Sequence, residues 1–210
     1  MSGMKQNMEQ WEAAGLPGEG KTTEEIFRFI EEYCRDAAQK SKKVICFPEL
    51  TIAPNPLGVT VYESTVTVSG TITDRLSKIC RTYGIYLIVG IAQKSRVPGR
   101  VYDEVLVMNP VGEILTEYVI HTVDGTRQLY LCGSAYKESQ FFNLPFAKAG
   151  LLAGGDVFDD ELVWQYKDAD VIFMCLSDQK EGPDRAASVA ERLGKTVILA
   201  GTEPGIFEGC

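Results

Sequence analysis

Histidine and basic residues are scarce in this sequence. One histidine occurs in 210 residues, and 21 Lys and Arg residues stand against 29 Asp and Glu residues, for a net charge of −8. Nucleic-acid-binding proteins normally carry a basic face, so this acidic balance argues against a nucleic-acid partner. A tight basic run occurs only at Lys40, Lys42 and Lys43, and we interpret it as a solvated helix end.

Long apolar runs and paired cysteines are also missing. No stretch approaches the roughly 18 apolar residues that span a bilayer, and Met1 to Glu12 is too polar for a signal peptide. The six cysteines form no C-x-x-C pair, which excludes a typical zinc site or disulfide framework. We therefore predict no membrane association, no metal and no cofactor, in the cytoplasm or another reducing intracellular compartment.

What remains is an ordinary globular composition, with 45% hydrophobic and 24% charged residues. Residues 1–20 contain several glycines without apolar periodicity, which predicts a flexible arm, and residues 21–210 read as one domain. Thr22 or Thr23 caps a helix that reaches about Gln39. Further helices are predicted over 72–83, 159–166 and 183–193, and strands over 44–47, 86–91, 101–109, 114–122, 141–146, 148–153, 171–176 and 197–200. This alternation predicts an α/β fold with mixed sheets.

A phosphate-binding motif is matched literally by residues 15–22, which fit G-x-x-x-x-G-K-S/T. Such a loop needs a strand before it and a helix after it. The helix is predicted, but residues 1–14 show no strand pattern. A nucleotide-binding module built on Gly15 to Thr22 is therefore a minor alternative to the flexible arm.

A carboxylate follows the first predicted strand at the corner Phe47-Pro48-Glu49-Leu50. Ligands of open α/β sheets bind beyond the carboxyl ends of strands, so Glu49 could act there as a general base. Taken alone, the commoner interpretation is a surface or capping glutamate.

The order of the motifs adds weight to Glu49. The Phe-Pro-Glu corner is followed by a buried strand, by a hairpin around Asn109-Pro110-Val111-Gly112, and by a strand pair over 141–153. This succession resembles the carbon-nitrogen hydrolase (nitrilase) superfamily from about Thr23 to Gly209. The resemblance implies an α-β-β-α sandwich, usually dimerised through helices, with a Glu-Lys-Cys catalytic set that hydrolyses amides or nitriles.

Carried over position by position, the resemblance keeps one catalytic residue and loses two. Glu49 matches the glutamate base, Ile120 stands where the family has its lysine, and Gly154 stands where it has its cysteine nucleophile. A glycine cannot form a covalent intermediate, and an isoleucine cannot stabilise an oxyanion. A pocket around these positions would include Cys175, Ser177, His121 and Asp156. His121 and Cys175 are more readily interpreted as structural residues than as a displaced lysine or nucleophile.

The resemblance also implies a sandwich that is incomplete at both ends, lacking the first strand and the C-terminal part. Open sheet edges favour a covering partner, so we expect a homo-oligomer or a subunit of a larger complex. The leading hypothesis is a non-catalytic homologue that serves as a structural or binding subunit. The alternatives are an active amidase or nitrilase with a relocated Cys nucleophile, and the nucleotide-binding module.

Overall fold

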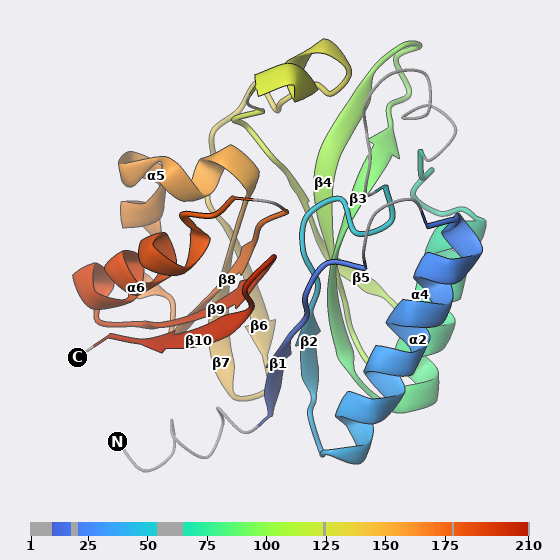
Figure 1. Cartoon of the computed structure of the whole chain (residues 1–210), viewed down its shortest axis with the longest axis horizontal. Coiled ribbons are helices and arrows are strands. Elements are labelled where there is room, and N and C mark those ends of the chain that lie inside the picture. The colour runs from blue at the N-terminus through green and yellow to red at the C-terminus, as the bar shows by residue number, and fades with distance from the viewer. Residues whose placement is uncertain (1–9, 18–20, 54–64, 124, 178, 210) are drawn as a thin grey trace.

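The fold is a sandwich of two sheets with helices on both outer faces (Figure 1). A computed structural model describes residues 10–17, 21–53, 65–123, 125–177 and 179–209. Within these ranges each sheet has five strands, and each contains both parallel and antiparallel pairs. The predicted α-β-β-α sandwich with mixed sheets is confirmed.

The first sheet holds the N-terminal half of the chain. In spatial order its strands are β1 (Trp11–Ala13), β2 (Val44–Cys46), β3 (Tyr86–Lys94), β4 (Val101–Met108) and β5 (Ile114–Val119). The first three are parallel, and β4 runs antiparallel to both of its neighbours, so β5 runs in the same direction as β2. Helices α2 (Thr23–Gln39) and α4 (Thr71–Tyr83) cover its outer face.

The second sheet holds the C-terminal half. Its order is β10 (Gly205–Glu208), β9 (Thr196–Ala200), β8 (Val171–Cys175), β7 (Ala147–Ala153) and β6 (Gln140–Leu144). The central strands β7, β8 and β9 are parallel, and the two outer strands are antiparallel to them. Helices α5 (Asp160–Gln165) and α6 (Gly182–Leu193) cover this sheet, and short 3-10 helices η1 (Gly125–Leu129), η2 (Gly154–Phe158) and η3 (Tyr166–Asp168) join the strands.

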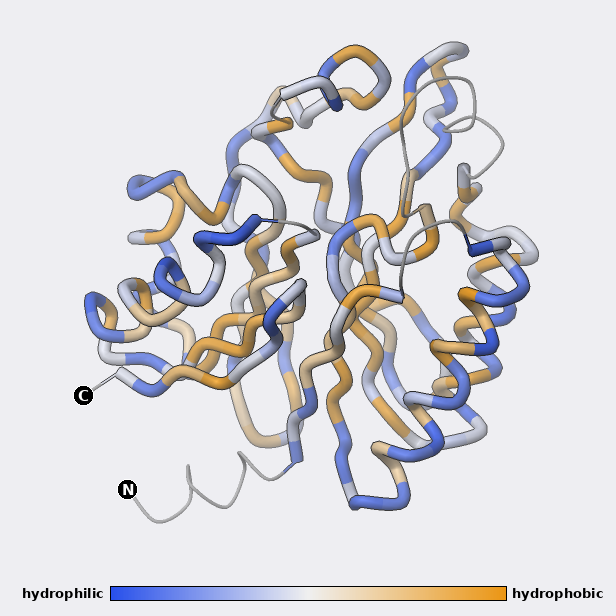
Figure 2. Tube along the Cα trace, viewed as in Figure 1, coloured by the Kyte–Doolittle hydropathy of each residue, from blue (hydrophilic) through white to orange (hydrophobic). Residues whose placement is uncertain are grey.

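Most of the core of the described residues lies in three layers, one between the sheets and one under each helix pair, and a smaller cluster surrounds Leu50. Hydrophobic segments run along the strands, while the outward faces of the helices are hydrophilic (Figure 2). Phe173 on β8 is fully buried in the inter-sheet layer, whereas Phe27 on α2 is buried under the helices. This inter-sheet packing fixes how the ends of strands from different sheets meet.

Two local signals predicted from the sequence are confirmed. Thr22 caps α2 through a capping box with Glu25, and Gly84 ends α4 in a left-handed conformation, with φ of 62°.

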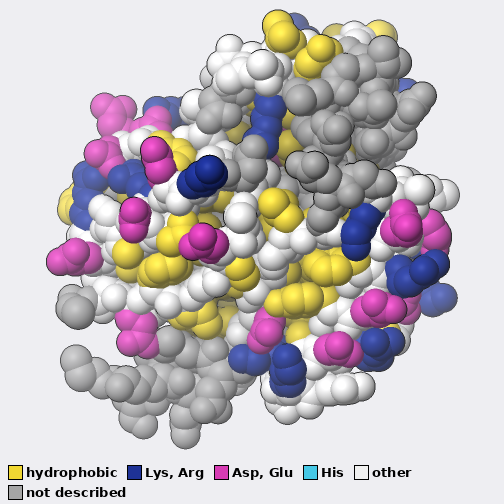
Figure 3. All heavy atoms as spheres, in the orientation of Figure 1, with side chains coloured by type: hydrophobic (Ala, Val, Ile, Leu, Met, Phe, Trp, Pro, Cys, Tyr) yellow, Lys and Arg dark blue, Asp and Glu magenta, His cyan; other side chains and the backbone are white. Residues whose placement is uncertain are grey.

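No helix among the described residues is long and apolar enough to cross a membrane. The face seen in Figure 3 mixes both charge signs and shows hydrophobic side chains across its centre.

The prediction that residues 1–20 contain no strand is wrong. β1 pairs in parallel with β2, with Trp11 opposite Val44. Three residues are too few to show an alternating pattern, so periodicity could not reveal this strand. Burial of one large side chain holds it instead, because Trp11 is 1% exposed and packs against Phe146 and Phe173. The domain therefore begins before residue 21; residues 1–9 and 18–20 of the predicted arm lie outside the described residues.

Candidate functional site

Four strand ends meet at the candidate site. Glu49 follows β2, and Ile120 follows β5, which runs in the same direction in the first sheet. Gly154 and Ser177 follow the parallel strands β7 and β8 of the second sheet. The side chains beyond these ends converge, as expected for sites at the carboxyl ends of strands.

A tight turn positions Glu49. The N–H of Gly90 on β3 donates to the Pro48 carbonyl, and the Thr51 hydroxyl donates to the same carbonyl at 2.7 Å. A Cβ on Gly90 would collide with the Glu49 and Leu50 backbone, so only glycine lets the turn lie against β3. Leu50 adopts a positive φ of 51°, a strained conformation for a non-glycine residue.

The Glu49 carboxylate is fully buried and interacts with Ser177, Arg127 and Gln179. The Ser177 hydroxyl donates to its Oε1 at 2.5 Å, and Arg127 forms an ion pair with the same oxygen. Arg127 also donates through Nη2 to the Ser177 hydroxyl at 2.5 Å, which closes a three-residue network. Burial raises the pKa of Glu49 above its ordinary value, and the Arg127 charge partly opposes that rise.

Gly154 lies directly against this carboxylate. Its φ is 53°, in the left-handed region, and a Cβ there would stand 2.6 Å from Glu49 Oε2 and 3.2 Å from Ile120 Cδ1. The structure thus brings together Glu49, Ile120 and Gly154, the three positions that the resemblance assigns to the catalytic set. Ile120 is 1% exposed and supplies only an apolar surface.

Asp156 has a structural role at the rim of the site. Its buried carboxylate accepts from the Tyr118 hydroxyl at 2.7 Å and from the backbone N–H groups of His121 and Thr122, both at 2.8 Å. These bonds tie η2 to the segment that carries Ile120. The His121 ring is directed elsewhere, since its Nε2 accepts from the Glu138 N–H at 3.3 Å.

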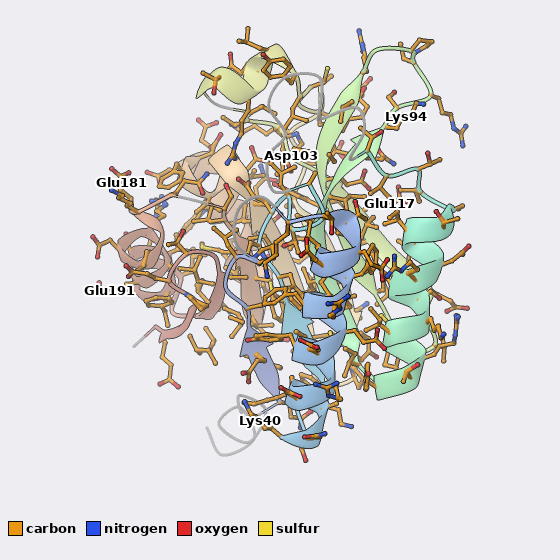
Figure 4. The ribbon with its side chains drawn as sticks, turned by 45° about the vertical axis from the view of Figure 1, so that its right-hand side comes forward. Lys40, Lys94, Asp103, Glu117, Glu181 and Glu191 are labelled. Atoms are coloured by element: carbon orange, nitrogen blue, oxygen red, sulfur yellow. The ribbon has the colours of Figure 1, made fainter. Side chains whose placement is uncertain are left out.

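Cys175 lies in the core next to another cysteine. It is fully buried, and its sulfur lies 3.5 Å from that of Cys46. Burial, together with the neighbouring Cys46, Glu49 and Asp103, raises the pKa of Cys175 well above its ordinary value, which disfavours the thiolate. Asp103, labelled in Figure 4, lies on β4 toward the opposite end of the first sheet from Lys40.

The segment of the phosphate-binding motif is committed to other contacts. β1 supplies the preceding strand that seemed missing, but the Thr22 hydroxyl is engaged with Glu25 in the helix cap. The Lys21 ammonium lies 5.5 Å from the centre of the Phe29 ring. Residues 18–20, the centre of the motif, lie outside the described residues.

Arg127 is the site residue that sequence reasoning missed. It comes from η1, in a polar connection between β5 and β6, and no local pattern distinguishes it from a surface arginine. A weak signal was available, since a glutamate predicted to lie at a buried strand end requires a cation.

Comparisons with known proteins identify a matching family. The family model described as Carbon-nitrogen hydrolase matches residues 13–200. No curated protein sequence matches the chain.

Several solved structures share the fold. An amidase of the nitrilase superfamily from Nesterenkonia AN1 aligns with a TM-score of 0.72 and 17% identity, covering 94% of this chain and 86% of that one. Saccharomyces cerevisiae Nit3, a member of branch 10 of the nitrilase superfamily, aligns with a TM-score of 0.78 and 15% identity, covering 91% and 74%. Identities this low establish the fold alone. Because the family model matches most of the sequence, the chain belongs to the carbon-nitrogen hydrolase family.

Proposed function

We propose that this chain is a non-catalytic member of its family that acts as a structural or binding subunit. The family's ancestral activity is hydrolysis of non-peptide carbon-nitrogen bonds in amides or nitriles. The observation that carries the proposal is Gly154, which stands beside the base candidate Glu49 where the resemblance places the cysteine nucleophile. No tuning of neighbouring groups replaces a missing sulfur.

The comparison with the Nesterenkonia amidase supports this proposal. One structure of that protein shows acrylamide added at its active-site cysteine. In this chain, the space beside Gly154 is taken up by the Glu49 carboxylate and the Ile120 side chain. Arg127 and Ser177 both engage Glu49 Oε1, so the base candidate is tied into a hydrogen-bonded network.

A relocated cysteine is less well supported. A nucleophile needs a thiolate and access to substrate, whereas Cys175 is fully buried and its raised pKa favours the neutral thiol. Cys175 therefore fits a core thiol better than a catalytic one.

The subunit role rests on the sheet edges. β1 and β10 each end a sheet among the described residues, and hydrophobic side chains gather across the face where these edges lie (Figure 3). Ile206 on β10 is 40% exposed. Open edges next to apolar surface favour pairing with another chain, so we propose a homo-oligomer or a larger complex. The unpaired cysteines of the described residues favour the cytoplasm or another reducing intracellular compartment as its location.

Turnover assays on the purified protein test this function. We expect no hydrolysis of aliphatic amides, nitriles or carbamoyl compounds, and a native mass above that of a monomer. Hydrolysis that disappears in Cys175→Ala, with folding intact, would instead establish the relocated nucleophile.

A further inference from the structure

Two thiols face each other between the two sheets, at the ends of the strands that lead into the candidate site. Cys46 ends β2 in the first sheet, and Cys175 ends β8 in the second. Both are fully buried in the inter-sheet core, and their sulfur atoms lie 3.5 Å apart. A disulfide bond is about 2.0 Å long, so the sulfurs need to approach by only about 1.5 Å.

We propose that Cys46 and Cys175 form a reversible dithiol–disulfide couple that links the two sheets covalently. The oxidant is hydrogen peroxide, which is small enough to enter through local opening of the fold. One thiolate attacks the peroxide and becomes a sulfenic acid, and the second thiol then displaces water from that sulfur. Overall, two S–H bonds and the O–O bond break, while one S–S bond and two O–H bonds form. Both sulfurs are oxidised, and the peroxide is reduced to two waters.

The position of the couple gives this oxidation a structural consequence. Cys46 lies three residues before Glu49, and Cys175 lies two residues before Ser177. The Ser177 hydroxyl donates a hydrogen bond of 2.5 Å to the Glu49 carboxylate. A disulfide would therefore lock together the two strand ends that carry the site.

The cross-link also closes a long segment of chain, because its cysteines are 129 positions apart. In the chain-entropy account, such a link lowers the unfolding equilibrium constant by on the order of a thousandfold. Burial raises the pKa of Cys175, so the reaction should be slow. It should stop at the disulfide, since each sulfur has a partner thiol within reach.

Peptide mapping after native oxidation tests the proposal. The folded protein is treated with hydrogen peroxide, free thiols are alkylated, and the digest is analysed by mass spectrometry without reduction. We expect the intact mass, measured before alkylation, to fall by two hydrogens. A peptide containing Cys46 should be linked to one containing Cys175, and the denaturant concentration at the unfolding midpoint should rise. Dithiothreitol should reverse all three changes.

Matched variants provide the controls. Cys46→Ala and Cys175→Ala should each abolish the link, whereas Cys34→Ala and Cys80→Ala, at equally buried positions in the outer core, should retain it. Oxygen addition at Cys46 or Cys175 without loss of hydrogens would overturn the proposal. So would a disulfide from Cys46 to a different cysteine that forms equally well in Cys175→Ala. If an alanine variant fails to fold, the peptide map of the unmodified chain still decides between these outcomes.

Discussion

The Glu49 carboxylate lies so close to Gly154 that a Cβ on Gly154 would stand 2.6 Å from Glu49 Oε2. The glycine is therefore required by its neighbour as well as by its own positive φ. The two residues form one unit in which the carboxylate partly fills the space that a side chain at Gly154 would need.

Gly154→Ala should destabilise the protein for both reasons. Left-handed backbone strain costs about 1–2 kcal/mol, and overpacking against Glu49 and Ile120 brings the total to about 2–5 kcal/mol. Urea denaturation measures the change. Gly84→Ala is the matched control, because φ there is 62° and nothing lies within 4 Å of the added Cβ, so it should show the strain alone. Equal losses in the two variants would mean that Glu49 does not crowd Gly154.

Arg127→Met should destabilise the fold strongly, because it leaves the buried Glu49 carboxylate without its cation. Breaking one partner of a buried ion pair costs about 3–5 kcal/mol. Glu49 already has a raised pKa in the folded chain, and without Arg127 it would rise further. The loss should therefore be largest at high pH and shrink as the pH falls through the raised folded-state pKa of Glu49, because the protonated carboxyl no longer needs the Arg127 charge.

The exposed pair Arg35–Asp36 offers a control for the charge alone. Arg35→Met should cost no more than about 1 kcal/mol, since surface ion pairs contribute little. If Arg127→Met costs as little as this control, the Glu49–Arg127 pair does not stabilise the site.

A second buried carboxyl group makes stability depend on pH. Glu104 on β4 is fully buried, and burial with the neighbouring Glu117 charge raises its pKa to about 8. Glu117 lies on the adjacent strand β5 (Figure 4). Since the folded chain binds this proton more tightly than the unfolded chain, the free energy of unfolding falls as the pH rises from 4.5 to about 8.

Glu104→Gln should remove this dependence, because its amide can donate to Glu117 without titrating. At pH 7 the variant should be more stable than the unmodified protein, by at most roughly 3 kcal/mol. Below pH 4.5 the two should be equally stable. Denaturation at several pH values measures the difference, and a gain that does not change with pH would contradict the assignment to Glu104.

Local chemistry determined how much of the fold was predictable. The cap at Thr22, the stop at Gly84 and the Asn109–Gly112 turn depend on neighbouring residues, so the sequence predicted those boundaries well. β1 and β10 span only three and four residues, which is too short to leave a periodic signal; β1 is held by a strand 33 positions away, with Trp11 opposite Val44, and by burial of Trp11.

The site shows the same division. Glu49 was noted because it follows a recognisable strand and corner, whereas Gly154 was identified only through the resemblance to the family. The contacts of Arg127 with Glu49 and Ser177 span 78 and 50 positions, and the Cys46–Cys175 contact spans 129. Such contacts depend on how the two sheets pack, which no local pattern encodes.

The most direct test of the account is whether the folded protein can be acylated or alkylated at its candidate site. Incubation with an amide-site electrophile such as acrylamide or fluoroacetamide, followed by intact-mass analysis, should show no stoichiometric adduct near Glu49. One adduct per chain on Cys175, lost when Glu49 is replaced by Gln in a folded variant, would contradict it.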